Sequence, residues 1–536
     1  MTVANAADVT RTVADPNAEY LSMRDIWDRN RAVCGGERYV KALDQRLSPS
    51  MQNMLIPFSP SMTQPQYDFY RLEAELPGIV SQFSKMLVGG LLRKTPVLTL
   101  PDDMPEGVRE EAHDWIMNSF TQDNSSITSF LDTALWEEIQ TGRAWVYVDY
   151  PFVEDADSLT NADFRELAPF PILWKPEEIV NWKLGKDEKG NAVLKQIIVR
   201  TLVEQYGDTE DTEFHPTFKD TVYVHELDSV GYYQIRVFER ADDVQDAPVV
   251  NGNPYKKQSD SKVAFPLVDT ITGIKANGER LTRIPAWPLN GSMKITDPII
   301  SAIVDKEISL YNKISRRNHL LYGAATYTPV IFSDMGEKEF DEIVASGLGS
   351  WLRLPMEAKV EVLKTPTDAL KDMEKAIASA IEEMARLGIR MLSPETAQSG
   401  IALEIRNAAQ TAQLGSLNNK VSAIMSKIIA FMLNWRYDLE LTDSDVEFDL
   451  SSDFNPIPLG ADWIRLATEW YENGLLPRSV WLQILKQNDI VSPDYDDEDG
   501  QTEIIEDDLI QGQAKAENED IQDQLDKELE DEDLDA

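Results

Sequence analysis

The segment from 297 to 321, DPIISAIVDKEISLYNKISRRNHLL, has a clear helical pattern. Its apolar residues are spaced seven, four and seven apart: Ile303, Leu310, Ile314 and Leu321. This spacing places them in one stripe along a helix. Proline suits the first helical turn, and Pro298 stands at the start of the segment. The pattern predicts a helix over 297–322 with one buried face.

A small β-rich unit and two further helices follow. TYTPVIF (326–332) and WLRLPMEAKVEVL (351–363) have the composition of strands. A second amphipathic helix is predicted from 367 to 390, with Thr367 as its N-cap. From about 401 to 438 only one glycine interrupts a helical composition. This predicts a helix of about 38 residues, or about 57 Å, which is several times the ordinary helix length of about 11 residues.

The residues before 297 have a mixed pattern. Residues 1–18 are expected to be a disordered arm, and helical patterns cover 19–32 and 66–94, the second with Pro77-Gly78 as its one internal breaker. Ser126 is expected to cap a helix that ends at Gly142, and a strand is expected to follow at 144–149. Further strands are expected at 171–174, 193–203, 221–227 and 232–240. These segments predict one mixed α+β domain.

The chain is strongly acidic. Its 536 residues include 93 Asp and Glu against 51 Lys and Arg, a formal charge of −42. Residues 494–536 contain 20 acidic residues and two lysines, and are expected not to fold on their own. This balance disfavours tight nucleic-acid binding and attachment to an anionic membrane.

Cysteine and histidine are scarce. The single cysteine, Cys34, and four well-separated histidines exclude a disulfide framework and indicate no zinc motif, so we expect no cofactor and a reducing compartment. No signal-peptide pattern opens the sequence, and no apolar run is long enough to span a bilayer. We therefore expect a soluble, intracellular chain.

No catalytic motif emerges. The phosphate-binding loop, the serine nucleophile elbow and the zinc-protease motif are all missing, and the acidic tail has a tyrosine where a calcium loop needs its first ligand. An enzyme site around Asp149, Tyr150 and His225 is one open alternative. The basic group Arg316, Arg317 and His319 could contact phosphate or could interact with the helix C-terminal dipole, and both interpretations stay open.

Five short segments occur in an order that resembles the portal proteins of tailed bacteriophages. They are Gly142-Arg143, Val148–Pro151, Ile179–Trp182, Trp351–Pro355 and Leu387–Leu392. Their collinear order, with the helix, β unit, helix and long helix described above, carries the resemblance, which extends over roughly residues 20–490.

The resemblance implies an α+β portal fold with named parts. Residues 19–296 and 402–460 would form the wing, including the long wing helix and a strand. Residues 297–322 and 367–390 would be two stem helices, and 323–366 the clip. Residues 391–401 would be the tunnel loop, 461–493 crown-like helices and 494–536 the acidic tail. The loop residues implied to line the DNA channel are Leu392, Ser393, Pro394, Glu395, Thr396, Gln398 and Ser399, and the stem residues implied to face DNA are Arg316, Arg317 and His319.

The function implied by the resemblance is structural rather than enzymatic. A homo-oligomeric ring, typically a dodecamer, would stand at one vertex of the virion capsid after assembly in the host cytoplasm. Double-stranded DNA would pass through it non-specifically during packaging and ejection. Its partners would be the terminase large subunit, the major capsid or scaffold protein, and head–tail adaptor or tail proteins, with no membrane involved. The alternative is an acidic capsid-associated adaptor that forms no channel.

Overall fold

The structure is a computed structural model, and the chain divides into two compact units, Met1–Ser452 and Asp453–Ala536. The longer stretches that the structure describes are 12–46, 61–151, 167–186, 192–205, 217–241, 264–272, 279–325, 328–332, 359–363, 368–386, 400–437 and 439–450. The shorter ones are 55–57, 59, 190, 275–276, 336, 338, 465, 468–471, 478, 481–482 and 485.

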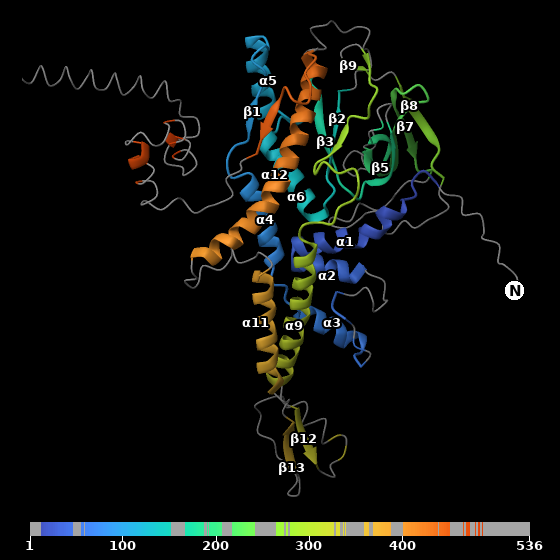
Figure 1. Cartoon of the computed structure of the whole chain (residues 1–536). Helices are drawn as coiled ribbons and strands as arrows, with labels where there is room; N and C mark the ends of the chain where they lie inside the picture. The colour runs from blue at the N-terminus through green and yellow to red at the C-terminus, as the bar shows by residue number, and fades with distance from the viewer. Residues whose placement is uncertain are drawn as a thin grey trace, which may run out of the picture. The chain divides into compact units, whose positions relative to one another are not determined.

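The first unit has a mixed α+β architecture with several antiparallel sheets (Figure 1). Its helices are α1 (Ala18–Gly35), α2 (Glu37–Arg46), α3 (Gln64–Glu73), α4 (Ile79–Leu91), α5 (Glu106–Asn118), α6 (Ile127–Thr141), α9 (Ser301–Ala325), α11 (Asp368–Arg386) and α12 (Gly400–Tyr437). Its longer strands are β2 (Trp145–Asp149), β3 (Phe170–Trp174), β4 (Ile179–Lys186), β5 (Ala192–Gln205), β6 (Thr217–Leu227), β7 (Tyr233–Glu239), β8 (Leu267–Ile271), β12 (Thr328–Phe332) and β13 (Lys359–Leu363). Its shorter strands are β1 (Val97–Thr99), β9 (Lys275–Ala276), β10 (Glu279–Arg280), β11 (Ala286–Pro288) and β14 (Glu447–Asp449).

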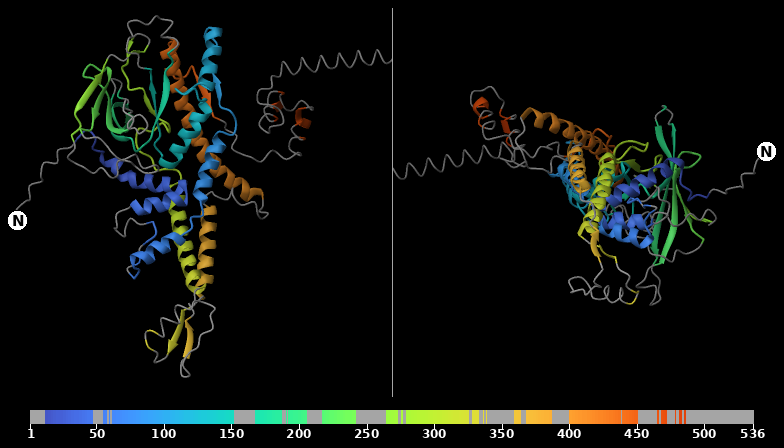
Figure 2. Two further views of the ribbon diagram at one scale, coloured as in Figure 1. Left: turned by 180° about the vertical axis from the view of Figure 1, so that it is seen from behind. Right: turned by 90° about the horizontal axis from the view of Figure 1, so that it is seen from below.

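The largest sheet is antiparallel and has the order β4-β5-β6-β7-β8. Helix α1 packs on one of its faces (Figure 2). The buried cluster between them consists of Ala14, Tyr20, Met23, Trp27, Val180, Ile198, Val222 and Val224. Burial of these apolar side chains is the main force that holds the helix on the sheet.

The second sheet, β11-β2-β3, contributes aromatic side chains to the neighbouring core. Tyr147 of β2 stacks on Trp174 of β3 with ring centroids 4.6 Å apart. His225 of β6 lies 5.0 Å from the Tyr147 ring and 4.9 Å from the Trp174 ring. These contacts join the two sheets through an aromatic cluster.

The turn between α6 and β2 forms as the sequence predicts. The Ser126 side chain accepts a hydrogen bond from the backbone N–H of Ser129, and Gly142 ends the helix in the left-handed region at φ +65°. The expected strand follows at once as β2. A side chain at Gly142 would come within 2.7 Å of the Thr296 carbonyl oxygen, so glycine is needed for this close approach as well as for its φ.

The long helix is present as α12, with 38 residues. Its C-terminal half has a buried face, and two of its serines bind the backbone of the segment that contains β14. Ser426 Oγ accepts from the N–H of Phe448 at 3.0 Å, and Ser422 Oγ accepts from the N–H of Leu450 at 3.1 Å. β14 pairs in turn with β1, so α12 is tied to a strand more than 300 residues before it in the chain.

Three sequence expectations are wrong in detail. Part of the expected arm is ordered, because Ala14 is buried in the α1 cluster and Asn17 caps α1. The pattern at 66–94 is interrupted at 74–78 and forms two helices, α3 and α4, with Gly78 in the left-handed region at φ +73° just before α4. The helix expected from 297 begins at Ser301, after a turn in which the Ser301 N–H bonds the Pro298 carbonyl.

Two strands of the large sheet were not expected from sequence. β4 covers residues 179–186, which include the residues Asn181-Trp182-Lys183. Its pairing with β5 has register shifts at two places. β8 has four exposed residues out of five and therefore lacks the alternation that marks a half-buried strand.

The second unit is described at a few positions only, and those positions are helical. Tyr471 stacks on Trp481 with ring centroids 4.6 Å apart, and the Trp481 indole N–H donates to Thr468 Oγ1 at 3.2 Å. These helical positions agree with the helices expected within 461–493. The acidic tail at 494–536, including the run that was compared with a calcium loop, lies outside the described residues.

Among the described residues, a search for helices with the length and hydropathy of a membrane span found none.

Candidate functional site

Helices α9 and α11 lie side by side in both Figure 1 and Figure 2. Lys306 Nζ lies 2.5 Å from Glu383 Oε1, near one end of the pair. Arg317 lies 3.9 Å from Glu374 Oε1, nearer the other end. Since the higher number in α9 pairs with the lower number in α11, the two helices are antiparallel, and the hairpin of β12 and β13 connects them in sequence.

Helix α11 has one face toward α9 and one open face. The residues turned inward recur every three or four positions: Leu370, Met373, Ile377, Ala380 and Met384. The side opposite to these residues, here called the open face, consists of Lys371, Asp372, Lys375, Ala378, Ser379 and Glu382, all exposed. Glu374, Ala376, Ile381 and Glu383 are exposed along the borders between the two faces. The helix as a whole has five acidic and three basic residues, a net charge of −2. Its open face therefore has no dense row of cations.

A buried carboxylate fastens α9 to α4. Glu307 is 0% exposed, and its two oxygens accept from the backbone N–H groups of Ile79 at 2.9 Å and Val80 at 2.6 Å. These N–H groups belong to the first turn of α4, where a helix lacks internal acceptors and carries a partial positive charge. Burial raises the pKa of Glu307, and the hydrogen bonds from α4 oppose that rise.

The three basic residues predicted on this helix have partners within the chain. Arg317 faces Glu374 of α11, and His319 Nδ1 lies 3.3 Å from Glu73 Oε2 of α3. Arg316 has an exposed side chain and a hydrogen bond to Tyr70. These contacts join α9 to α3 on one side and to α11 on the other.

The other predicted channel residues, Leu392, Ser393, Pro394, Glu395, Thr396, Gln398 and Ser399, lie outside the described residues. The structure describes α11 to Arg386 and resumes at Gly400 with α12. The expected tunnel loop thus overlaps α12 at its last two positions, 400 and 401.

His225, a residue of the possible enzyme site, belongs to a buried chain of hydrogen bonds. His225 Nδ1 lies 2.6 Å from Tyr233 Oη, which lies 3.2 Å from Tyr147 Oη. Tyr147 donates to Asp149 at 3.3 Å. His225 is 4% exposed, and burial lowers its pKa to about 3, so the ring is neutral at physiological pH.

The other two residues near this chain also have packing roles. Burial raises the pKa of Asp149, and the Tyr150 ring stacks on Trp435 of α12 with centroids 5.4 Å apart. A histidine that is neutral and enclosed by aromatic rings is not placed to exchange a proton with a substrate. The geometry fits a satisfied polar network inside the core.

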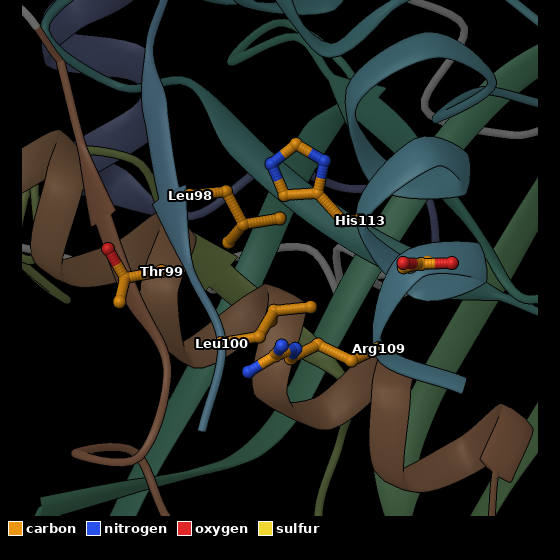
Figure 3. Close-up of a pocket in the computed structure, with 6 residues that line it drawn as sticks. Leu98, Thr99, Leu100, Arg109 and His113 are labelled. Carbon is orange, nitrogen blue, oxygen red and sulfur yellow. The ribbon is translucent and has the colours of Figure 1, made fainter. Parts of the chain in front are cut away.

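A pocket of about 420 Å³ lies between β1 and α5 (Figure 3). It is lined by Leu98, Thr99, Leu100, Arg109, Glu110 and His113. Arg109 forms an ion pair with Asp102 at 3.1 Å. The lining combines two leucines with side chains of both charges, and it contains no nucleophile beside a base. The sequence has no motif that marks these residues.

The described part of the chain was searched for metal sites, and the environment of its one cysteine was assessed for reactivity. A search there for clusters of three or more possible metal ligands found none. Cys34 is buried beside Ser84, and burial raises the pKa of its thiol to about 12. A thiol in that state is protonated at neutral pH and unreactive.

Comparison with known proteins gives a family model and a set of solved structures. A family described as a domain of unknown function, DUF4055, matches residues 300–436. This match spans α9, β12, β13, α11 and nearly all of α12. The search of curated proteins found no match.

Solved structures of gene transfer agent (GTA) particles are similar to this chain. "Virion of native gene transfer agent (GTA) particle" has a TM-score of 0.37 and 10% identity over 82% of this chain and 96% of that chain. "Neck of empty GTA particle computed with C6 symmetry" has a TM-score of 0.35 and 11% identity, over 75% and 87%. "Neck of native GTA particle computed with C12 symmetry" has a TM-score of 0.35 and 10% identity, over 76% and 89%. Because each TM-score is below 0.5, these similarities do not assign a function to this chain.

Proposed function

We propose that this chain is the subunit of a portal ring, a closed conduit for double-stranded DNA at one vertex of a phage-like capsid. The observation that carries the proposal is the order α9, β hairpin, α11, long α12, with α9 and α11 antiparallel and linked by two ion pairs. This order matches the stem, clip, stem and wing-helix order of the portal family that the sequence resembles.

The helix pair suits a subunit of a ring. Glu307 anchors α9 to the wing helix α4, and His319 and Arg316 connect α9 to α3. Helix α11 is left with an open polar face among the described residues. In a ring closed by rotation, each subunit presents one flank to the next, and one remaining face turns to the axis. We assign the open face of α11 to the axial channel.

The charges of the chain suit a conduit through which DNA slides. Dense Lys and Arg contacts would hold the phosphate backbone through counterion release. The open face of α11 balances its two lysines with two acidic residues, and the whole chain has a charge of −42. Repulsion over about one Debye length, roughly 8 Å in cellular salt, would keep binding weak.

Further parts of the proposal concern residues near the channel. Of the three basic residues, Arg316 has the most exposed side chain, and we propose it as the one that approaches DNA. The tunnel loop at the narrowest part of the channel is proposed to lie within residues 391–399, since 400 and 401 belong to α12. The segment 323–366 is proposed as the clip that meets the terminase large subunit and later the head–tail adaptor or tail proteins. The wing is proposed to contact the capsid or scaffold protein.

The first test is the mass and shape of the purified full chain. Light scattering should give a particle of roughly 0.7 MDa, about twelve subunits, and negative-stain images should show rings with an axial opening. A monodisperse monomer at all concentrations and salts, without rings, would contradict the proposal.

The second test separates a portal from an acidic adaptor without a channel. Residues 323–366 are replaced by a short Gly/Ser linker in the full chain. Under the portal proposal the variant loses terminase binding in a pull-down with the purified large subunit, while its capsid or scaffold binding persists. Retained terminase binding would favour the adaptor alternative.

A further inference from the structure

Arg143 has a buried guanidinium group for which the described part of the chain provides no hydrogen-bond acceptor. Its side chain is 2% exposed and stacks on the ring of Trp182, with Cζ 3.8 Å from the ring centroid. Stacking satisfies the face of the guanidinium, but its N–H groups point outward in the plane. Among the described residues, no atom accepts from Nε, Nη1 or Nη2.

A fourth buried donor lies beside it. The indole Nε1 of Trp145 also lacks an acceptor among the described residues, and this tryptophan is 0% exposed. Arg143 Cζ lies 5.7 Å from the Trp145 ring centroid. Two side chains therefore bring four unsatisfied nitrogen donors to one small region of the interior.

The charge at this place is also unbalanced. Burial lowers the pKa of Arg143 to about 10, so the group is still protonated at neutral pH. Glu138 and Glu19 attract it over a distance, but neither is within ion-pair range. Glu138 is occupied with the backbone N–H of Ala144 and the side chain of Asn290, and Glu19 is exposed on α1. A buried charge without a close partner costs several kcal/mol.

We propose that Arg143 and Trp145 bind a small monovalent anion of the chloride class inside this unit. An anion in the plane of the guanidinium accepts from two neighbouring nitrogens along one of its edges, with the Trp145 indole N–H as a further donor, and it neutralises the guanidinium charge. Water fits the same place less well, because it must also donate its own two hydrogens and the unsatisfied groups there are donors only. Because both side chains are buried, we propose a small ion rather than a large one.

The place of this site gives it a mechanical consequence. Arg143 follows Gly142, whose position is packed against Thr296 and Pro298 in the segment that leads to α9. The ion would therefore stabilise the junction between α6, β2 and the start of the stem pair. This inference does not depend on the portal proposal.

The test is thermal unfolding of the full chain at constant ionic strength, with sodium chloride exchanged for sodium gluconate. The melting temperature should rise with chloride and saturate, by roughly 1–3 °C at ten times the dissociation constant. Arg143→Gln should lose this dependence. Trp145→Phe, which removes one donor, should shift the midpoint to higher chloride. Arg109→Gln, at a half-buried arginine of α5, should behave as the wild type.

Two further experiments decide whether an anion or the Glu19 carboxylate accepts from Arg143. If Glu19 closes onto Arg143 instead, chloride will have no effect on the wild type and will act only on Glu19→Gln, and the proposal is then wrong. Equal melting temperatures in chloride and gluconate for both proteins would also overturn it, as would a dependence retained in Arg143→Gln. If Arg143→Gln does not fold, crystals grown with bromide should show an anomalous peak beside the guanidinium, and the lack of a peak there would reject the site.

Discussion

His225 is a neutral histidine within the aromatic core, and this state makes the protein sensitive to acid. Its pKa is lowered to about 3 by burial, whereas an unfolded histidine has a pKa near 6.5. Between these values the unfolded state binds a proton that the folded state excludes. The histidine therefore removes stability as the pH falls below about 6.5, and it has no such effect above that pH.

We expect His225→Gln to reduce this acid sensitivity. Between pH 7 and pH 4.5 the wild type should lose about 2–3 kcal/mol more unfolding free energy than the variant, as measured by urea denaturation. Glutamine keeps a polar partner for Tyr233, so the fold should survive. His113→Gln, at an exposed histidine, is the control and should follow the wild type. Equal losses in wild type and His225→Gln would show that the histidine already binds a proton in the fold.

Glu307 is a helix cap supplied from a distant part of the chain. Glu307→Ala leaves the two N–H groups at the start of α4 without their acceptor, so the free energy of unfolding should fall by about 1–3 kcal/mol. Glu383→Ala breaks an exposed ion pair on the same helix pair and should cost less than about 1 kcal/mol. Similar losses in the two variants would contradict the capping role.

At the scale of the element, the turn from α6 to β2 depends on one glycine. Gly142→Ala combines the cost of a left-handed residue, about 1–2 kcal/mol, with a 2.7 Å approach to the Thr296 carbonyl. Gly291 has a similar φ of +72°, but a Cβ there meets only Ile424 at 3.9 Å. Gly291→Ala should therefore show the conformational cost alone, and Gly142→Ala should be roughly 1–3 kcal/mol worse in thermal or urea unfolding. Equal costs would mean that the segment before α9 can move away.

The helices also show where periodicity predicts an element and where it fails. The stripes of α9 and α11 and the uninterrupted composition of α12 predicted these helices to within a few residues. The pattern at 66–94 kept its helical spacing across Pro77 and Gly78, although the chain turns there and forms α3 and α4. Apolar spacing indicates which residues face a core, but it does not show that the backbone between them is continuous.

At the scale of the whole molecule, the proposed channel makes a prediction about charge. Asp372→Lys with Glu382→Lys changes the open face of α11 by +4 in each subunit. We expect the rings to form and to bind duplex DNA, with an affinity that falls steeply as salt rises, because the added cations release counterions. The measurement is a salt series of DNA binding by fluorescence anisotropy.

The matched control reverses two exposed acidic residues of α5, Glu110→Lys with Asp114→Lys, for the same change in net charge. This control should gain much less affinity for DNA if the α11 face lines the channel. Loss of rings in the α11 variant alone would assign that face to the contact between subunits. Equal DNA binding by the two variants would contradict the assignment of α11 to the channel.

The order of the elements was determined by the sequence itself, because helix stripes, caps such as Ser126 and turn glycines such as Gly142 act over a few neighbouring residues. Only the tertiary structure decided how distant polar groups meet. Glu307 reaches α4 across 228 positions, and Tyr147 meets Tyr233 across 86. The sequence places Arg143 directly after a helix and does not show that folding buries it on Trp182. Such contacts depend on which surfaces pack together, and local propensity carries no information about that packing.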